Sequence, residues 1–143
     1  MNYLIQFMIM IVLYSFKFFI ILNFMKSIAF IFSNSPYGNS ISKEGLDVVL
    51  SCSLTTKKIA LFFIDDGVLQ LFLNQKPEYI NSYNYSLSFK ILSLYDIKDF
   101  FFCKYSAYKR GLKENDNFLL PVKFLNNICL RRKINSFDYI LKW

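Results

Sequence analysis

Cys103 is the side chain of this sequence best suited to covalent chemistry. We expect it near the end of a strand over residues 97–104, directly before a short helical stretch over residues 105–110 that Gly111 terminates. The backbone N–H groups of a helix start stabilise a thiolate, and so do nearby cations, here Lys104, Lys109 and Arg110. A thiolate in this place can accept a sulfur atom as a persulfide. A half-buried cysteine that only fills the turn is the other interpretation, and the residues alone leave both open.

Asp65 and Asp66 are candidates for a metal site or a general base. Adjacent side chains of an extended chain point to opposite sides, so two such carboxylates rarely converge on one ion. The sequence contains no histidine, which excludes histidine acid–base chemistry and histidine metal ligands. We therefore expect no metal and no cofactor. A turn, a helix cap or a hydrogen bond across a subunit contact is the favoured role for this pair.

The loop over residues 33–40 and the cysteine pattern argue against other kinds of site. The loop, SNSPYGNS, joins a predicted strand to a predicted helix, but it matches neither GxGxxG nor a P-loop, so we expect no nucleotide site. Cys52, Cys103 and Cys129 are odd in number and lack CxxC spacing. This pattern argues against disulfides and zinc and predicts a reducing, cytoplasmic location. Cys52 is expected to be a buried structural thiol on a helix.

The positive charge of the chain is spread out. The formal net charge is +7, and the basic clusters are short: residues 57–58, 109–110 and 131–133. Such clusters are typical of solvated helix ends and loop edges. Because no nucleic-acid-binding motif accompanies them, we expect no direct contact with nucleic acid.

The stretch over residues 58–72 organises the rest of the chain. Its apolar run, residues 59–64, is typical of a central parallel strand that is covered on both faces. The run stops at Asp65, Asp66 and Gly67, and an apolar pattern with helical spacing follows over residues 68–72. The carboxyl end of such a strand is where sites and partner surfaces tend to lie in open α/β sheets.

Strands and helices alternate over the remaining residues. Further strands are expected at residues 26–32, 97–104 and 137–143, and further helices at residues 41–55, 84–94 and 123–134. Ser40 or Ser42 is the expected N-cap of the first helix. Residues 118–122 are at most an edge strand, because Pro121 lacks an N–H. This order predicts an α/β fold: a single three-layer domain with a mostly parallel sheet and helices on both faces.

Two apolar sets have opposite expected roles. Leu87, Ile91 and Leu94 are expected to share the apolar face of the helix at residues 84–94, with Phe89 and Leu92 close by. Aromatic side chains not needed for the core are candidates for an oligomer interface: Tyr79, Tyr83 and Tyr85.

Residues 1–24 form an apolar run that is long enough to span a bilayer. Lys17 lies inside this run, and the run lacks the basic start and cleavage site of a signal peptide. Met25 and Lys26 lie at the start of a predicted strand, and a Met-Lys pair followed by a strand is a natural start for a protein. We therefore expect residues 1–24 to be a hydrophobic extension that is either spurious, because the start was assigned too far upstream, or non-essential. We expect residues 25–143 to be the domain, and no membrane partner. A membrane anchor is the alternative.

Several segments, taken in order, resemble the TusC/DsrF group of the DsrE/DsrF-like sulfur-relay family. They are MKSIAFIFSNSPYGNSISKEGLDVVL, LFFIDDGVLQL, the NQKP turn, FKILSLYDI, FFCKYSAYKRGL and the terminal DYILKW. The resemblance covers residues 25–143 and does not extend into residues 1–24. It implies a small α/β fold with a five-stranded sheet.

The resemblance also implies partners and a role. Members assemble with TusB-like and TusD-like subunits as a heterohexamer, a dimer of heterotrimers. That complex takes persulfide sulfur from a cysteine desulfurase by way of TusA and passes it through TusE toward 2-thiolation of the tRNA wobble uridine. The relay cysteine is assigned to the TusD-like subunit, at the position that Cys103 matches here. We therefore expect a structural, non-catalytic subunit; a persulfide-carrying sulfurtransferase that uses Cys103, and a small membrane-anchored protein, are the alternatives.

Overall fold

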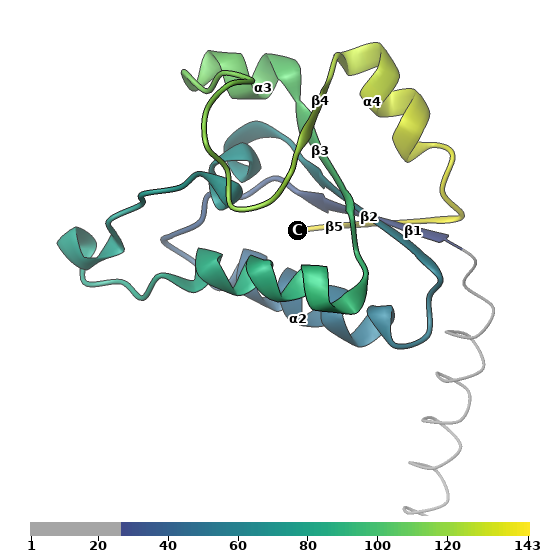
Figure 1. Ribbon diagram of the computed structural model, residues 1–143, viewed down its shortest axis with the longest axis horizontal. Coiled ribbons are helices and arrows are strands. Elements are labelled where there is room, and N and C mark those ends of the chain that lie inside the picture. Colours follow the sequence, from purple (N-terminus) through teal and green to yellow (C-terminus); the bar gives the residue numbers. More distant parts are fainter. Residues whose placement is uncertain (1–26) are drawn as a thin grey trace, which may run out of the picture.

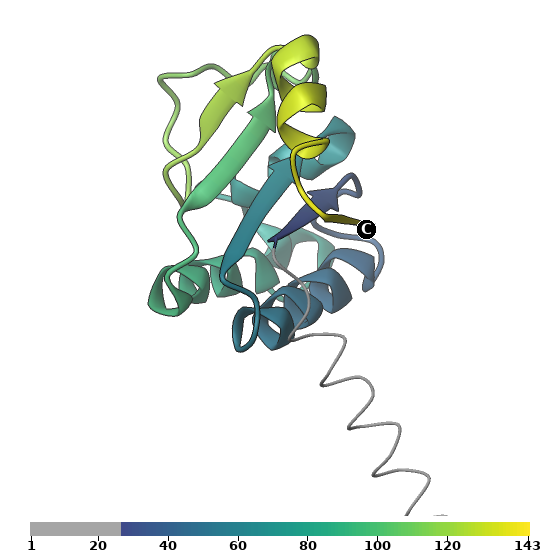
Figure 2. The ribbon, with the colours of Figure 1, turned by 90° about the vertical axis from the view of Figure 1, so that its right-hand side faces the viewer.

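The computed structural model describes residues 27–143, which form one five-stranded sheet in the order β4-β3-β2-β1-β5. All four strand pairings are parallel. Figure 2 shows the strands from β4 to β1 side by side and pointing the same way. The strands are β1 (Ser27–Phe32), β2 (Lys58–Phe63), β3 (Asp99–Cys103), β4 (Lys123–Leu125) and β5 (Tyr139–Lys142). The prediction of a parallel α/β sheet is confirmed.

Helices cover both faces of the sheet, as predicted. One face packs on α2 (Ile41–Ser53) and on the 3-10 helices η1 (Asp65–Leu71) and η3 (Tyr85–Tyr95); η2 (Pro77–Ile80) lies in the connection between η1 and η3. The other face packs on α4 (Asn127–Ile134), and α3 (Lys104–Lys109) follows the end of β3. Figure 1 shows α2 on one side of the sheet and α4 on the other.

β2 is the central strand that its apolar run predicts. Every residue from Ile59 to Phe63 is buried, because both faces of this strand are covered. Aromatic side chains of neighbouring strands stack in register across the sheet. The ring centroids of Phe62 and Phe101 are 5.1 Å apart, and those of Phe32 and Phe63 are 5.4 Å apart. Such cross-strand pairs stabilise the sheet and fix its register.

The segment after residue 117 differs from its prediction. The helix predicted from residue 123 begins at Asn127, and residues 123–125 form the edge strand β4. Asn126 caps α4, because its side-chain oxygen accepts the N–H of Cys129 at 2.8 Å. Residues 118–122 are not a strand; Phe118 forms an isolated antiparallel bridge with Phe72. A three-residue edge strand is too short for its pattern to stand out from that of the helix beside it.

The connection between β2 and β3 is built from 3-10 helices. At three residues per turn, Ser86, Phe89 and Leu92 align on the buried side of η3. The apolar residues predicted to share one face, Leu87, Ile91 and Leu94, are exposed instead. That prediction was wrong because it assumed the 3.6-residue period of an α-helix.

Gly67 allows η1 to pack against the end of β1. A Cβ atom at this position would lie 2.0 Å from the backbone oxygen of Phe32, so no larger residue fits without movement of the backbone. The sequence after Asp66 therefore needs a glycine for close approach of two backbones.

The predictions for residues 1–24 lie outside the described residues. Within residues 27–143, no helix is long and apolar enough to cross a membrane.

Candidate functional site

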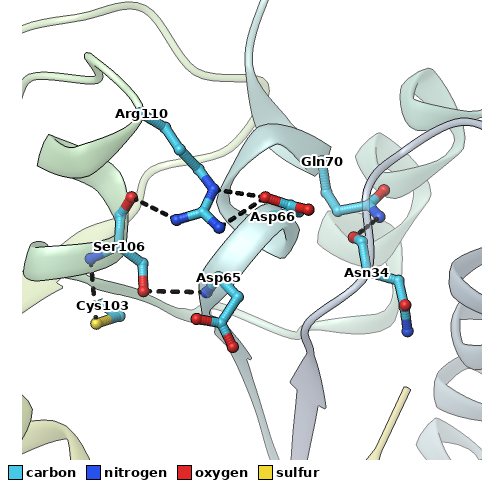
Figure 3. Close-up of polar contacts among 7 residues, drawn as sticks. All are labelled: Asn34, Asp65, Asp66, Gln70, Cys103, Ser106 and Arg110. Atoms are coloured by element: carbon cyan, nitrogen blue, oxygen red, sulfur yellow. Dashed lines mark hydrogen bonds and ion pairs between the residues drawn. The ribbon is translucent and has the colours of Figure 1, made fainter.

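Cys103 lies where the sequence predicted it, at the carboxyl end of β3 and the start of α3. Its Sγ atom accepts the backbone N–H of Ser106 at 3.4 Å, so the cysteine is the N-cap of α3 (Figure 3). Its thiol donates to Oδ1 of Asn127, on α4, at 3.3 Å. The residue is 6 % exposed. The thiol is therefore held between two helices by two weak hydrogen bonds.

An open hollow of about 320 Å³ lies in front of Cys103. Its walls come from the end of β2, from α3 and from α4. The polar or charged residues among its walls are Asp65, Tyr105, Ser106, Asn127 and Arg131, and the apolar ones are Ile64, Leu130 and Ile134. The hollow thus presents one thiol, one carboxylate and one guanidinium to an approaching molecule.

The cations predicted to surround Cys103 do not line this hollow. The Lys104 ammonium lies 2.7 Å from a carboxylate oxygen of Glu114, and this contact raises the pKa of Lys104 and lowers the pKa of Glu114. Lys109 is exposed. Lys104 is therefore paired with Glu114, Lys109 is in solvent, and neither lysine is part of the hollow that Cys103 lines.

Arg110 is also turned to another partner. Its guanidinium lies 2.6 Å from a carboxylate oxygen of Asp66 and donates to the backbone oxygen of Ser106 at 3.1 Å (Figure 3). The cation that does line the hollow is Arg131, which sequence reasoning missed. A helix predicted to begin at Asn127 would have revealed it. The i, i+3, i+4, i+7 spacing of such a helix places four residues on one side, the side that faces Cys103: Asn127, Leu130, Arg131 and Ile134.

The two adjacent aspartates diverge, as expected for neighbouring side chains. Asp66 pairs with Arg110, whereas Asp65 lines the Cys103 hollow and its N–H donates to Ser106 Oγ at 3.0 Å. Asp65 has φ +49, in the left-handed region that a tight corner requires and that Asp tolerates. The turn was predicted correctly, but the cap was not, because Ile64 is the N-cap of η1 and makes no side-chain bond. Within residues 27–143, no group of three or more cysteines or acids is arranged to hold a metal ion.

A buried polar network lies on the opposite face of the sheet. Gln70 is fully buried, and its Nε2 donates to the backbone oxygen of Asn34 at 2.8 Å and to Ser42 Oγ at 2.7 Å. The hydroxyl of Tyr85 donates to Gln70 Oε1, and burial raises the pKa of Tyr85 to about 12. Figure 3 shows the bond between Gln70 and Asn34. The side-chain amide of Gln70 therefore holds the loop over residues 33–40 at Asn34. Ser42, one of the two expected N-caps, belongs to this network. Ser40, the other, is the N-cap residue of α2, although its side chain makes no capping hydrogen bond.

The remaining candidates divide between core and surface. Cys52 is buried on α2, as predicted, and burial raises the pKa of its thiol. Tyr85 belongs to the core, so it leaves the predicted interface set, whereas Tyr79 and Tyr83 are exposed. All three cysteines are free thiols, and Cys129 is exposed.

Comparison with known proteins gives a consistent result over the whole described domain. Residues 26–143 match the DsrE/DsrF-like family. Protein TusC of Buchnera aphidicola subsp. Acyrthosiphon pisum (strain 5A) is 51% identical over 119 residues, which cover 83% of this chain and 100% of the relative. Protein TusC of Buchnera aphidicola subsp. Baizongia pistaciae is 50% identical over the same shares of both chains. The crystal structure of the ychN protein from E. coli superposes with a TM-score of 0.69 at 21% identity and covers 83% of this chain and 100% of that one. At this identity the structural likeness shows a shared fold.

Proposed function

Because the chain belongs to the DsrE/DsrF-like family, we propose that it is a structural subunit of a sulfur-relay complex that acts in 2-thiolation of the tRNA wobble uridine. The observation that carries this proposal is the match to proteins named TusC, which extends over their entire length at about half identity. A match of this extent leaves no part of those relatives without a counterpart here.

The surroundings of Cys103 support a structural role for this residue. The thiol is buried, caps α3 and donates to Asn127, and the lysine next to it in sequence is paired with Glu114. A thiol that serves as a helix cap and a link between α3 and α4 contributes to folding without chemistry. We therefore assign no catalytic residue, metal or cofactor to this subunit.

The second candidate function is that of a persulfide carrier that uses Cys103. The observation that favours it is the open hollow, because Cys103 is the thiol that lines this hollow beside Arg131. A guanidinium at this place would stabilise a thiolate or a persulfide anion. The two candidates differ in one respect: only the second requires the sulfur atom of Cys103.

The proposal includes partners and a location. TusB-like and TusD-like subunits complete a heterohexamer, a dimer of heterotrimers, and TusA and TusE exchange sulfur with that complex. We propose the cytoplasm as the location, because tRNA is modified there, and we expect neither a membrane nor nucleic acid as a direct partner. Residues 25–143 would supply the whole subunit, and residues 1–24 would be dispensable for assembly.

Co-expression tests the assembly directly. The chain is produced with the TusB-like and TusD-like proteins of the same organism, with an affinity tag on the TusD-like protein alone, and the eluate is separated by size exclusion. We expect all three to co-elute in one peak, with the Met25–Trp143 form as effective as the full chain. A chain that stays in the unbound fraction, and is absent from the eluate of the tagged TusD-like protein, would overturn the proposal.

The fate of Cys103 separates the two candidate functions. The complex is loaded with sulfur by a cysteine desulfurase and TusA, and the peptide that contains Cys103 is analysed by mass spectrometry. The structural assignment predicts no persulfide on that peptide while the TusD-like subunit acquires one. A persulfide on Cys103 that TusE then removes would establish the carrier function instead.

A further inference from the structure

Three hollows of the surface meet at one residue of α4, Asn127. The Cys103 hollow is one of them. A second hollow, of about 670 Å³, follows α4 past Arg131 and Arg132 to Ser136. A third, of about 470 Å³, lies between α3 and the start of α4. The second and third hollows share Asn127 and Ile128, and the Cys103 hollow borders both of them at Arg131 and Tyr105. An extended segment laid along α4 would therefore occupy the second and third hollows and pass beside the Cys103 hollow.

The second hollow is cationic. Arg131 and Arg132 line it, and both are exposed. Within residues 27–143, neither arginine takes part in an ion pair, and α4 itself carries no acidic residue. Basic residues in the last turn also stabilise the helix dipole, but that effect requires no hollow between their side chains. Two unpaired guanidinium groups in a hollow are suited to carboxylates, which they bind through two parallel hydrogen bonds each.

The third hollow is apolar. Tyr105, Tyr108 and Ile128 line it, and Tyr105 and Ile128 are 63% and 71% exposed. A single exposed apolar residue is ordinary, but three that share one hollow are a place where an apolar side chain of a partner can be buried. Lys104, which also borders this hollow, is already paired with Glu114. The charge available to a ligand is therefore at the arginine end.

We propose that these hollows form one docking surface, the α4 surface (Tyr105, Tyr108, Asn127, Ile128, Arg131 and Arg132), for an acidic peptide segment that carries a large apolar side chain. The apolar side chain occupies the tyrosine end and the carboxylates bind the two arginines. The binding chemistry follows from the surface alone. We further identify the peptide as a segment of a sulfur-relay protein that meets the Cys103 hollow, and this identification rests on the proposed function.

RNA fits this surface less well than a peptide. Binding of a nucleic-acid backbone relies on many cations that follow successive phosphates. Here two unpaired arginines are followed by Lys133, whose ammonium lies over the ring of Phe101 at 5.5 Å from its centroid. Two cations beside an apolar hollow match a short acidic peptide.

The test measures peptide binding to the full chain by fluorescence anisotropy. The probe is a labelled peptide in which Leu-Phe precedes a run of glutamates. The double substitution Arg131→Glu/Arg132→Glu should raise its dissociation constant about ten-fold or more, because two charge-assisted contacts are lost and repulsion replaces them. Ile128→Asp, where the second and third hollows meet, should also weaken binding. Lys43→Glu and Lys90→Glu, which remove exposed cations from α2 and η3, are matched controls that should change nothing, and circular dichroism confirms that each variant is folded.

Four results would each overturn the inference. They are no binding by the wild-type chain, equal binding of a peptide with lysines in place of the glutamates, equal weakening by the control substitutions, and tighter binding of a single-stranded RNA at the same salt concentration. A parallel measurement of tRNA 2-thiolation supported by the wild-type chain keeps the two proposals apart. Thiolation without specific peptide binding would reject the α4 surface and leave the proposed function standing; peptide binding without thiolation would do the reverse.

Discussion

Removing one hydroxyl group from the core should measurably destabilise the domain. The hydroxyl of Tyr85 is the hydrogen-bond donor to Oε1 of Gln70, whose amide is fully buried. In the variant Tyr85→Phe this oxygen keeps its burial and loses its partner. A buried acceptor without a donor costs about 1–3 kcal/mol. For a domain of this size, that loss corresponds to a fall in Tm of roughly 4–12 °C.

Urea unfolding measures this loss conveniently, because the chain contains one tryptophan. Trp143 packs against Phe30 in the core, with ring centroids 5.7 Å apart, so its fluorescence reports global unfolding. Tyr83→Phe is the matched control, because Tyr83 is 83% exposed and should lose almost nothing. The double variant Gln70→Leu/Tyr85→Phe should be less destabilised than the sum of its single variants, since the side-chain oxygen that Tyr85→Phe leaves without a donor is absent from it. If Tyr85→Phe is as stable as Tyr83→Phe, the network does not stabilise the fold and the reasoning is refuted.

Three further predictions concern pH, packing and an ion pair. Burial raises the pKa of Tyr85 from 10.0 to about 12, so the folded state is favoured while this hydroxyl is protonated. The free energy of unfolding should be unaffected by this group below pH 10 and should fall as the pH rises toward 12. A pH profile that Tyr85→Phe leaves unchanged would contradict this assignment. Gly67→Ala places a Cβ atom 2.0 Å from the Phe32 backbone oxygen. In the same urea titration it should lower the free energy of unfolding by about 1–3 kcal/mol or more. An unfolding midpoint equal to that of the wild type would show that the backbone between β2 and η1 moves aside at no cost. Asp66→Asn removes the negative charge that lies 2.6 Å from the Arg110 guanidinium. Because this ion pair is partly solvent-exposed, the loss in the free energy of unfolding should stay below about 1 kcal/mol and shrink at high salt. A salt-independent loss above about 3 kcal/mol would identify a buried pair instead.

The parts of the fold that the sequence predicts are those where one local signal dominates. The apolar run that became β2 is covered on both faces, so it stands out without any knowledge of its neighbours. The turn at Asp65 and the position of Cys103 between β3 and α3 follow from the same kind of local signal. These elements required only the polarity and turn preferences of a few consecutive residues.

The parts that the sequence does not predict depend on long-range packing or on a change of helical period. β4 is an edge strand of three residues, and its partner, β3, is remote in sequence. The helix predicted from residue 123 therefore included β4 together with the residues after Asn126, which do form a helix. The 3-10 period of η3 changes which side of that segment is buried, and no residue type in the sequence distinguishes this period from that of an α-helix.

The candidate site illustrates the same limit. The sequence singled out Cys103 and its cationic neighbours, but Lys104 pairs with Glu114, ten positions further along. Arg131 reaches the hollow because α4 packs across the end of β3. The network around Gln70 joins residues of four separate segments, and amides and hydroxyls give no periodic signal. Placing such side chains requires the tertiary structure.

The level of 2-thiouridine in tRNA tests the central claim most directly. A bacterial host that lacks its own TusC-like subunit is supplied with the TusB-like and TusD-like partners of this chain, together with the wild-type chain, the Cys103→Ser variant or neither, and tRNA nucleosides are quantified by mass spectrometry. A structural subunit predicts that 2-thiouridine is lost without the chain and that wild type and Cys103→Ser restore it to the same level. Failure of the wild-type chain to restore it would contradict the sulfur-relay function, and failure of Cys103→Ser alone, with the complex intact, would contradict the structural role.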